Sequence, residues 1–209
     1  ELAAKGMYVR AMAEYQLGQF PAAVDDVGTF LKSNPPQKDA LDAEYLQGLS
    51  FAAQQKFKEA IQTYSGILTR DGKYADADKV LYELGWAYFE IPQMAESVAA
   101  FRRLGTEFPD SPLATESWFR VGEAQYEAGE FTEAVKAFSQ AQLKAVATSN
   151  QDIGEKAAHK SGWSHLKANN FVEAATAFDR QLKTYPAGAL AGDAEFLAGE
   201  CQYKQKKWQ

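Results

Sequence analysis

The sequence predicts an all-α solenoid built from helix-turn-helix repeats of about 37 residues each. A large apolar residue recurs at intervals of 37 residues, with one interval of 40. A small residue lies nine positions before each of these anchors, and a small and then a large residue follow three and seven positions after it. Four columns that keep step over five or six copies do not arise by chance, so the chain is a repeat protein.

Each of the four columns has five or six members. The anchors are Phe20, Phe57, Met94, Phe131, Phe171 and Trp208, and the small residues nine positions earlier are Ala11, Gly48, Gly85, Gly122, Gly162 and Gly199. The small residues three positions after the anchor are Ala23, Ala60, Ser97, Ala134 and Ala174, and the large residues at seven positions are Val27, Tyr64, Phe101, Phe138 and Phe178. Helices approach closely only where a side chain is missing, so we expect Gly122 to face Ala134 across the hairpin.

The columns divide the chain into six repeats of one domain, a single solenoid over residues 1–209. The predicted repeats are residues 3–39, 40–76, 77–113, 114–153, 154–190 and 191–209, the last without its second helix. A solenoid that ends on an unpaired helix exposes an apolar face. We therefore expect the sequence to be a piece of a longer protein, with any signal peptide or lipid attachment site outside it.

Local signals place the helices of the first three repeats. Gly18 can adopt the left-handed conformation that ends the first helix, and Pro21 suits the first turn of the second. Prolines 35 and 36 end that second helix. The second repeat closes before the glycine at position 72, and Pro92 marks the hairpin turn of the third.

The later repeats contain one clear start signal and one irregularity. Ser111 followed by Pro112 predicts an N-cap and a first helical residue, so the fourth repeat should begin its first helix at Pro112. Three residues are inserted within the segment 147–152, so either a helix lengthens or a loop grows. The insertion is either a tolerated surface change or a local change in superhelical twist.

Composition excludes several classes of protein. The net charge of −6 and the pI near 5.1 contradict the basic surface expected of a nucleic-acid binder. No apolar run approaches the roughly 18 residues that span a bilayer. The single cysteine, Cys201, excludes an internal disulfide framework and occupies a column of small packing residues. His159 and His165 are six residues apart and point in different directions on one helix, so we expect no metal, no cofactor and no active site.

The repeat columns resemble those of the tetratricopeptide repeat family, whose common unit has 34 residues. The extra turn in this chain lies at the start of each first helix and carries an alanine eight positions before the small residue, at Ala40, Ala77, Ala114 and Ala191. With the linker of residues 108–114, the sequence is similar to the bacterial-envelope branch of the family. That branch includes the Tol–Pal-associated cell-division coordinator and the lipoprotein of the outer-membrane β-barrel assembly machinery.

The resemblance implies a right-handed superhelix whose first helices line a concave groove that binds a peptide or protein. Two columns seven residues apart share one face of each first helix. From these columns and their neighbours we predict a partner-binding aromatic stripe of Tyr45, Tyr82, Trp86, Phe89, Phe119, Tyr126, His159 and Trp163. The alternative is that rings at helical spacing pack between neighbouring repeats.

These features together predict a non-catalytic module that binds a partner peptide or protein, in a periplasmic or cell-envelope complex. The alternative function is a self-assembling scaffold, and the alternative location is the cytoplasm. A carboxylate clamp of the kind used on chaperone tails needs an Asn one position after the small residue. That column contains none: its members are Met12, Leu49, Trp86, Glu123, Trp163 and Glu200.

Overall fold

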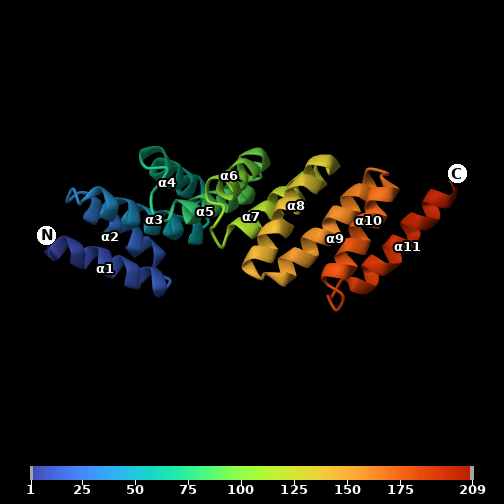
Figure 1. Ribbon diagram of the computed structural model, residues 1–209. Coiled ribbons are helices and arrows are strands. Elements are labelled where there is room, and N and C mark those ends of the chain that lie inside the picture. The colour runs from blue at the N-terminus through green and yellow to red at the C-terminus, as the bar shows by residue number, and fades with distance from the viewer. Residues whose placement is uncertain (1, 208–209) are drawn as a thin grey trace. The chain divides into compact units, whose positions relative to one another are not determined.

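The computed structural model describes residues 2–207, and within that range it contains eleven α-helices and no β-strand (Figure 1). The all-α class is therefore confirmed. The helices are α1 (Leu2–Gln16), α2 (Phe20–Leu31), α3 (Gln37–Ala53), α4 (Phe57–Arg70), α5 (Ala77–Glu90), α6 (Met94–Glu107), α7 (Ala114–Glu127), α8 (Phe131–Thr148), α9 (Gln151–Lys167), α10 (Phe171–Thr184) and α11 (Ala191–Lys207). Odd-numbered helices are the first helices of the repeats and even-numbered helices are the second. The anchor Trp208 lies outside the described residues.

The helices group into two compact units, Glu1–Ala100 and Phe101–Gln209. Within each unit, helices that follow one another in sequence pack together, as α1 does on α2 and α7 does on α8. The core of the first unit includes Ala11, Ala23, Val27, Phe30, Ala43 and Leu46. The second unit has one cluster around Phe138 and another around Phe178. The continuity of a single solenoid over the whole chain stays a prediction.

Left-handed residues end the first helix in four of the hairpins. They are Gly18, Gln55, Gly129 and Asn169, with φ angles of 74°, 60°, 76° and 60°. In each turn the residue that follows the left-handed one donates its backbone N–H to a carbonyl five residues back, as Glu130 does to Gln125 at 2.8 Å. This hydrogen bond satisfies a carbonyl that the helix leaves unpaired. The expectation for Gly18 is confirmed.

The small residue of the first helix makes room for an aromatic ring. An added Cβ on Gly122 would lie 2.6 Å from two ring carbons of Phe138, and one on Gly162 would lie 2.5 Å from Phe178. Gly48 is covered in the same way by Tyr64. All three rings are fully buried. We had expected Gly122 to face Ala134, but the ring of Phe138, one helical turn further along α8, fills that space.

The three-residue insertion lengthens a helix. α8 has 18 residues where α10 has 14, and only Ser149 and Asn150 separate α8 from α9. Ser149 is left-handed (φ 55°) and ends α8. The side chain of Asn150 accepts a hydrogen bond from the backbone N–H of Ile153 at 3.2 Å and so caps α9. Of the two predicted outcomes, the structure therefore shows the longer helix.

The predicted start of the fourth repeat was two residues early. The Oγ of Ser111 accepts from the backbone N–H of Leu113 at 3.1 Å, as a cap would, but the intervening residues form a turn. The helix α7 begins at Ala114. Ser111 therefore stabilises the turn that leads into the helix.

We expect Asn150→Ala to lower the free energy of unfolding by about 1 kcal/mol, because the variant leaves a helix N-terminal N–H without its acceptor. Asn170→Ala is the matched control, since Asn170 occupies the same position before α10 but makes no capping hydrogen bond through its side chain. Urea denaturation followed by far-ultraviolet circular dichroism measures both. Equal losses in the two variants would contradict a capping role for Asn150.

Candidate functional site

Three of the eight predicted partner-binding residues form a continuous row of rings on α5. Tyr82, Trp86 and Phe89 are spaced four and three residues apart and therefore share one helix face. Ring centroids are 6.2 Å apart for Tyr82 and Trp86, and 5.5 Å apart for Trp86 and Phe89, with interplanar angles of 76° and 80°. These edge-to-face contacts hold each ring in a defined orientation. We call this row the α5 ladder.

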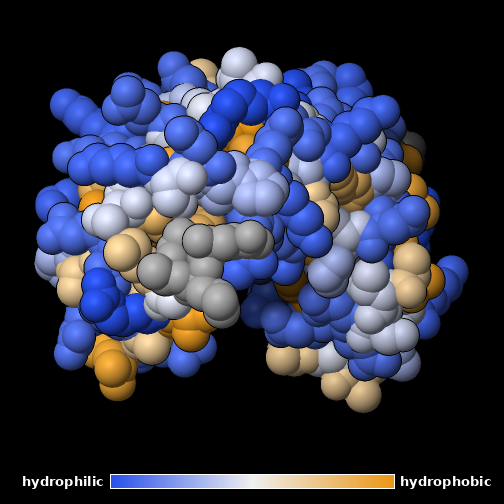
Figure 2. Space-filling view, turned by 90° about the vertical axis from the view of Figure 1, so that its left-hand side faces the viewer, coloured by the Kyte–Doolittle hydropathy of each residue, from blue (hydrophilic) through white to orange (hydrophobic). Residues whose placement is uncertain are grey.

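The α5 ladder reaches the surface. Phe89 is 45% exposed, and Tyr82 and Trp86 are half-buried. Met94, at the start of α6, is another exposed apolar side chain, at 41%. The molecular surface seen from the α1–α2 end is mostly hydrophilic, with apolar residues scattered across it (Figure 2). Three ordered aromatic rings in a row differ from such scattered groups and are the kind of surface that protein interfaces favour.

Two of the predicted site residues are buried in the core of the second unit. Phe119 and His159 are each only 8% exposed. Their rings lie 5.6 Å from the rings of Phe138 and Phe178, the residues that cover Gly122 and Gly162. This column therefore packs the first helix of a repeat against its second helix. The interpretation as packing residues, which the sequence left open, holds for these two positions.

Tyr45 belongs to the same column in the first unit. Its ring lies 6.2 Å from that of Tyr64 and is half-buried. Burial raises the pKa of the Tyr45 hydroxyl, as it does for Tyr64. Tyr45 therefore packs at the edge of the core, whereas Phe89 is exposed.

In the second unit, Tyr126 and Trp163 each lie beside a lysine. The Nζ of Lys160 is 5.1 Å from the ring centroid of Tyr126, and the Nζ of Lys167 is 6.0 Å from that of Trp163. Cations over aromatic faces at these distances are attracted to the ring. The α7 and α9 helices thus present aromatic groups accompanied by positive charge.

Trp163 is also held by the buried histidine. Its indole Nε1 donates to the Nε2 of His159 at 3.0 Å, while the Nδ1 of His159 lies 3.1 Å from the side-chain oxygen of Gln181. A neutral imidazole with its proton on Nδ1 satisfies both contacts. The carboxylate of Asp193 lies 2.9 Å from the same Nε2 and would take the contact if that nitrogen were protonated. His159 therefore orients Trp163 from inside the core.

The helix α5 also carries a half-buried carboxylate, Glu83. Burial raises the pKa of Glu83, which lies close enough to Tyr15, Tyr45 and Tyr64 to raise the pKa of each hydroxyl as well. The folded protein therefore favours the protonated form of Glu83 more than the unfolded chain does. Its contribution to stability falls as pH rises above the ordinary value of 4.5 and through the raised pKa.

We expect Glu83→Gln to melt at a higher temperature than the wild type at neutral pH, because glutamine resembles the protonated acid. The difference should vanish below about pH 4, where the carboxyl is protonated in both the folded and the unfolded chain. Thermal unfolding of both proteins across this pH range is the measurement. A difference that stays constant with pH would show that the titration of Glu83 has no part in it.

No group of three or more His, Cys, Asp or Glu side chains in residues 2–207 is placed to hold a metal ion. Cys201 is fully buried, and that burial raises the pKa of its thiol. Among the eleven helices described, none is both long enough and apolar enough to cross a membrane.

Two exposed aromatic residues on α11 were members of the predicted columns but were not chosen as site residues. Phe196 is 70% exposed and Tyr203 is 59% exposed. Between them lies Gly199, and no atom comes within 4 Å of the place where its Cβ would be. In the described structure, α11 therefore carries the same glycine as the earlier repeats, but without a ring over it.

Comparison with known proteins agrees with the repeat architecture. One tetratricopeptide repeat profile matches residues 8–76, 104–150 and 159–209, and a second tetratricopeptide repeat profile matches residues 79–111. No curated protein sequence matches the chain.

Solved structures with a similar fold include a crystal structure of MamA protein, with 16% identity, a TM-score of 0.68 and coverage of 88% of this chain and 92% of that one. Another is a set of nearly identical repeats from a putative kinesin light chain of Podosopora anserina, with 16% identity, a TM-score of 0.62 and coverage of 88% and 94%. At this identity, the likeness concerns the fold. The profiles, the eleven-helix architecture and the repeat columns together show that the chain belongs to the tetratricopeptide repeat family.

Proposed function

We propose that this chain is a non-catalytic interaction module that binds a peptide or protein partner on the first-helix face that carries the α5 ladder. The family supports an interaction role, and the ladder is the observation that carries the assignment. Its rings are held edge to face, so little side-chain freedom is lost when a partner covers them. Aromatic side chains of this kind supply much of the binding energy at protein interfaces.

The proposed setting is a complex of the bacterial cell envelope, in the periplasm. Its support is the resemblance of the linker of residues 108–114 and of the 37-residue unit to the envelope branch of the family. A cytoplasmic setting is the alternative. The choice affects which extract should contain the partner, so both are included in the test.

The test is affinity capture from separate envelope and cytosolic extracts, with partners identified by mass spectrometry. We expect a partner from the envelope extract whose recovery falls strongly with Phe89→Ala, since Phe89 is the most exposed ring of the ladder. Leu143→Ala is the control, because Leu143 is 65% exposed but belongs to the other unit. Circular dichroism confirms that both variants are folded. A partner retained equally by the two variants would refute the ladder as its site, and a partner found only in cytosol would refute the envelope setting.

Self-assembly as a scaffold is a second candidate, favoured by the exposed aromatic pair on α11. Phe196 and Tyr203 flank the uncovered Gly199, so a helix from another copy could approach closely there. Light scattering over a range of protein concentrations should then show a mass that increases with concentration and returns to that of one chain in Phe196→Ala. A constant monomer mass in the wild type would exclude this candidate.

A further inference from the structure

The second unit contains a niche on the second-helix side of the repeats. It has a volume of about 530 Å³ and lies over α7, between α6 and α8. Its lining residues are Arg102, Gly105, Thr106, Pro109, Trp118, Val121, Gln125, Glu133, Lys136, Ala137, Gln140 and Lys144, all within Phe101–Gln209. We call it the α6–α8 niche. A volume of this size suits a few residues of a peptide or a small ligand.

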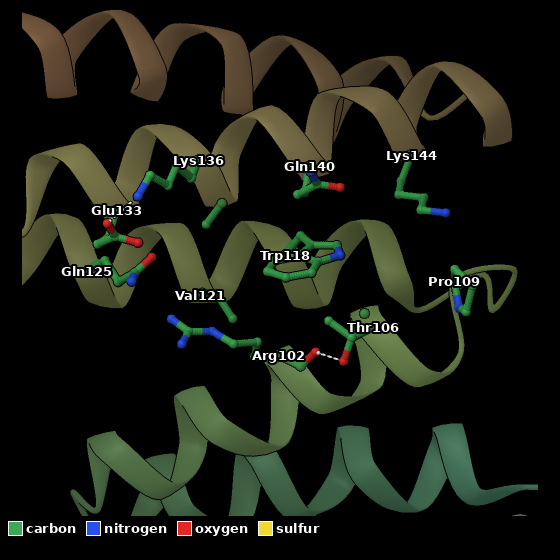
Figure 3. Close-up of a pocket in the computed structure, with 12 residues that line it drawn as sticks. Arg102, Thr106, Pro109, Trp118, Val121, Gln125, Glu133, Lys136, Gln140 and Lys144 are labelled. Carbon is green, nitrogen blue, oxygen red and sulfur yellow. Dashed lines mark hydrogen bonds and ion pairs between the residues drawn. The ribbon is translucent and has the colours of Figure 1, made fainter.

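The floor of the niche is the indole ring of Trp118. This ring lies against Gly105, where an added Cβ would be 2.4 Å from the indole nitrogen. Trp118 also packs on the cluster that contains Phe119 and Phe138. Figure 3 shows the indole in the middle of the niche, with Gln140 and Lys144 of α8 on one side and Thr106 of α6 on the other.

The charge of the niche is opposite to that of the chain. Three cations line it, and one of them, Lys136, is paired with Glu133 at 2.6 Å. No ion pair is recorded for Arg102 or Lys144 among the described residues, so two positive charges remain uncompensated. The whole chain carries a net charge of −6. At physiological salt, charges more than about 8 Å apart are largely screened, so the local cations dominate what a ligand experiences at this site.

Arg102 is held in place by a buried amide. Gln125 is 6% exposed. In the orientation that satisfies both of its ends, its amide nitrogen donates to the carbonyl oxygen of Glu133 at 3.1 Å and its oxygen accepts from the Arg102 guanidinium at 3.0 Å. One nitrogen of the guanidinium is thereby fixed, while its remaining N–H groups are left to bind an anion.

The next repeat contains the same niche with different chemistry. A cavity of about 390 Å³ lies over α9, between α8 and α10. Nine of its lining positions are equivalent to positions in the first: Ser139 for Arg102, Gln142 for Gly105, Ala158 for Trp118, Ser161 for Val121, His165 for Gln125, Glu173 for Glu133, Thr176 for Lys136, Ala177 for Ala137 and Arg180 for Gln140. The repeat therefore forms this cavity without an indole or an excess of cations. Of the two cavities, only the α6–α8 niche has a tryptophan and the two unpaired cations in its lining.

We propose that the α6–α8 niche binds an acidic peptide segment of another protein, in which a large apolar side chain is flanked by carboxylates. The apolar side chain covers the indole of Trp118, and the carboxylates pair with Lys144 and Arg102. Bidentate pairing of a carboxylate with a guanidinium and stacking on the indole are both favourable in such a half-enclosed site. This site is separate from the α5 ladder, and neither depends on the other.

The test is a titration of the full chain with a synthetic hexapeptide of two central leucines flanked on each side by two aspartates. The four tryptophan indole N–H signals are followed by nitrogen-15 correlation spectra and assigned by substitution. We expect saturable movement of the Trp118 signal, and binding roughly tenfold weaker in Lys144→Glu. Lys144→Gln should fall between, because it removes the charge without reversing it.

The matched control is Thr176→Glu, which places the same negative charge in the equivalent niche of the next repeat. We expect it to leave the affinity within about twofold of the wild type, since Thr176 lines the other cavity and not the α6–α8 niche. Phe89→Ala should likewise leave the affinity for this peptide unchanged. The experiment therefore tests the niche independently of the proposed partner binding at the α5 ladder. Any of three results would overturn the proposal: a Trp118 signal that does not move, equal weakening by Thr176→Glu, or binding as tight with lysines in place of the aspartates. Tighter binding of a single-stranded oligonucleotide at the same signal would also overturn it.

Discussion

Phe138→Ala should lower the free energy of unfolding by about 3–5 kcal/mol, the largest loss we expect from a single substitution in this chain. Phe138 is fully buried, fills the space left by Gly122, and packs 5.6 Å from the ring of Phe119. Its removal leaves a cavity between α7 and α8 that the surrounding helices can close only in part. Urea denaturation measures the loss.

The control for Phe138→Ala is Leu143→Ala on the same helix. Leu143 is 65% exposed, so its truncation should change stability by less than about 0.5 kcal/mol. Repeat proteins gain stability mainly from contacts between neighbours, so the loss in Phe138→Ala should be local. Hydrogen exchange should therefore show faster opening of α7, α8 and α9 before other helices of the second unit. Similar values for the two variants would contradict the central role of this ring.

Gly122→Ala should destabilise the protein, although alanine is the better helix former by about 1 kcal/mol. The new methyl group would lie 2.6 Å from two carbons of the Phe138 ring, which is fully buried and has no space to move into. Overpacking of this kind costs about 1–3 kcal/mol, so the net loss should be at most about 2 kcal/mol. Thermal and urea unfolding measure the balance of the two effects.

Gly199→Ala tests the same column where no ring is present. No atom lies within 4 Å of the added methyl group, so the gain in helix propensity should remain and the variant should be more stable by up to about 1 kcal/mol. The two substitutions should thus have opposite signs. The double variant Gly122→Ala/Phe138→Leu should lose less than the sum of its parts, because the smaller side chain makes room for the methyl group. Losses that add fully would show that the ring and the glycine do not interact.

The repeat, its period and its hairpins could be predicted from the sequence, because each depends on residue types at fixed local spacings. A glycine that must be left-handed, as at position 18, and columns that keep step are visible without a structure. The sequence could not decide which face of the first helices was covered. Periodicity places Phe119 and Phe89 on the same face of their respective helices. It does not show that Phe138 packs on Phe119, whereas Phe89 reaches solvent.

The helix start at Ala114 and the niche beside Trp118 were missed for a similar reason. Ser111 and Pro112 suit a turn as well as a helix N-terminus, and contacts beyond the local sequence decide between them. The niche is lined by residues from three helices, so no short sequence motif predicts it. The sequence does show a difference between the two repeats: Trp118 and Lys136 stand where the next repeat has Ala158 and Thr176.

A cavity recurs between successive second helices, and in it the residues that maintain the fold differ from the residues that would contact a ligand. Its existence depends on the backbone and on the glycine–aromatic contacts of the repeat, whereas its lining comes from positions that those contacts leave free. Substitutions in the lining can therefore change what is recognised without a large change in folding stability. Each duplication of a repeat would then add a new recognition position whose specificity can diverge while the inherited core is conserved.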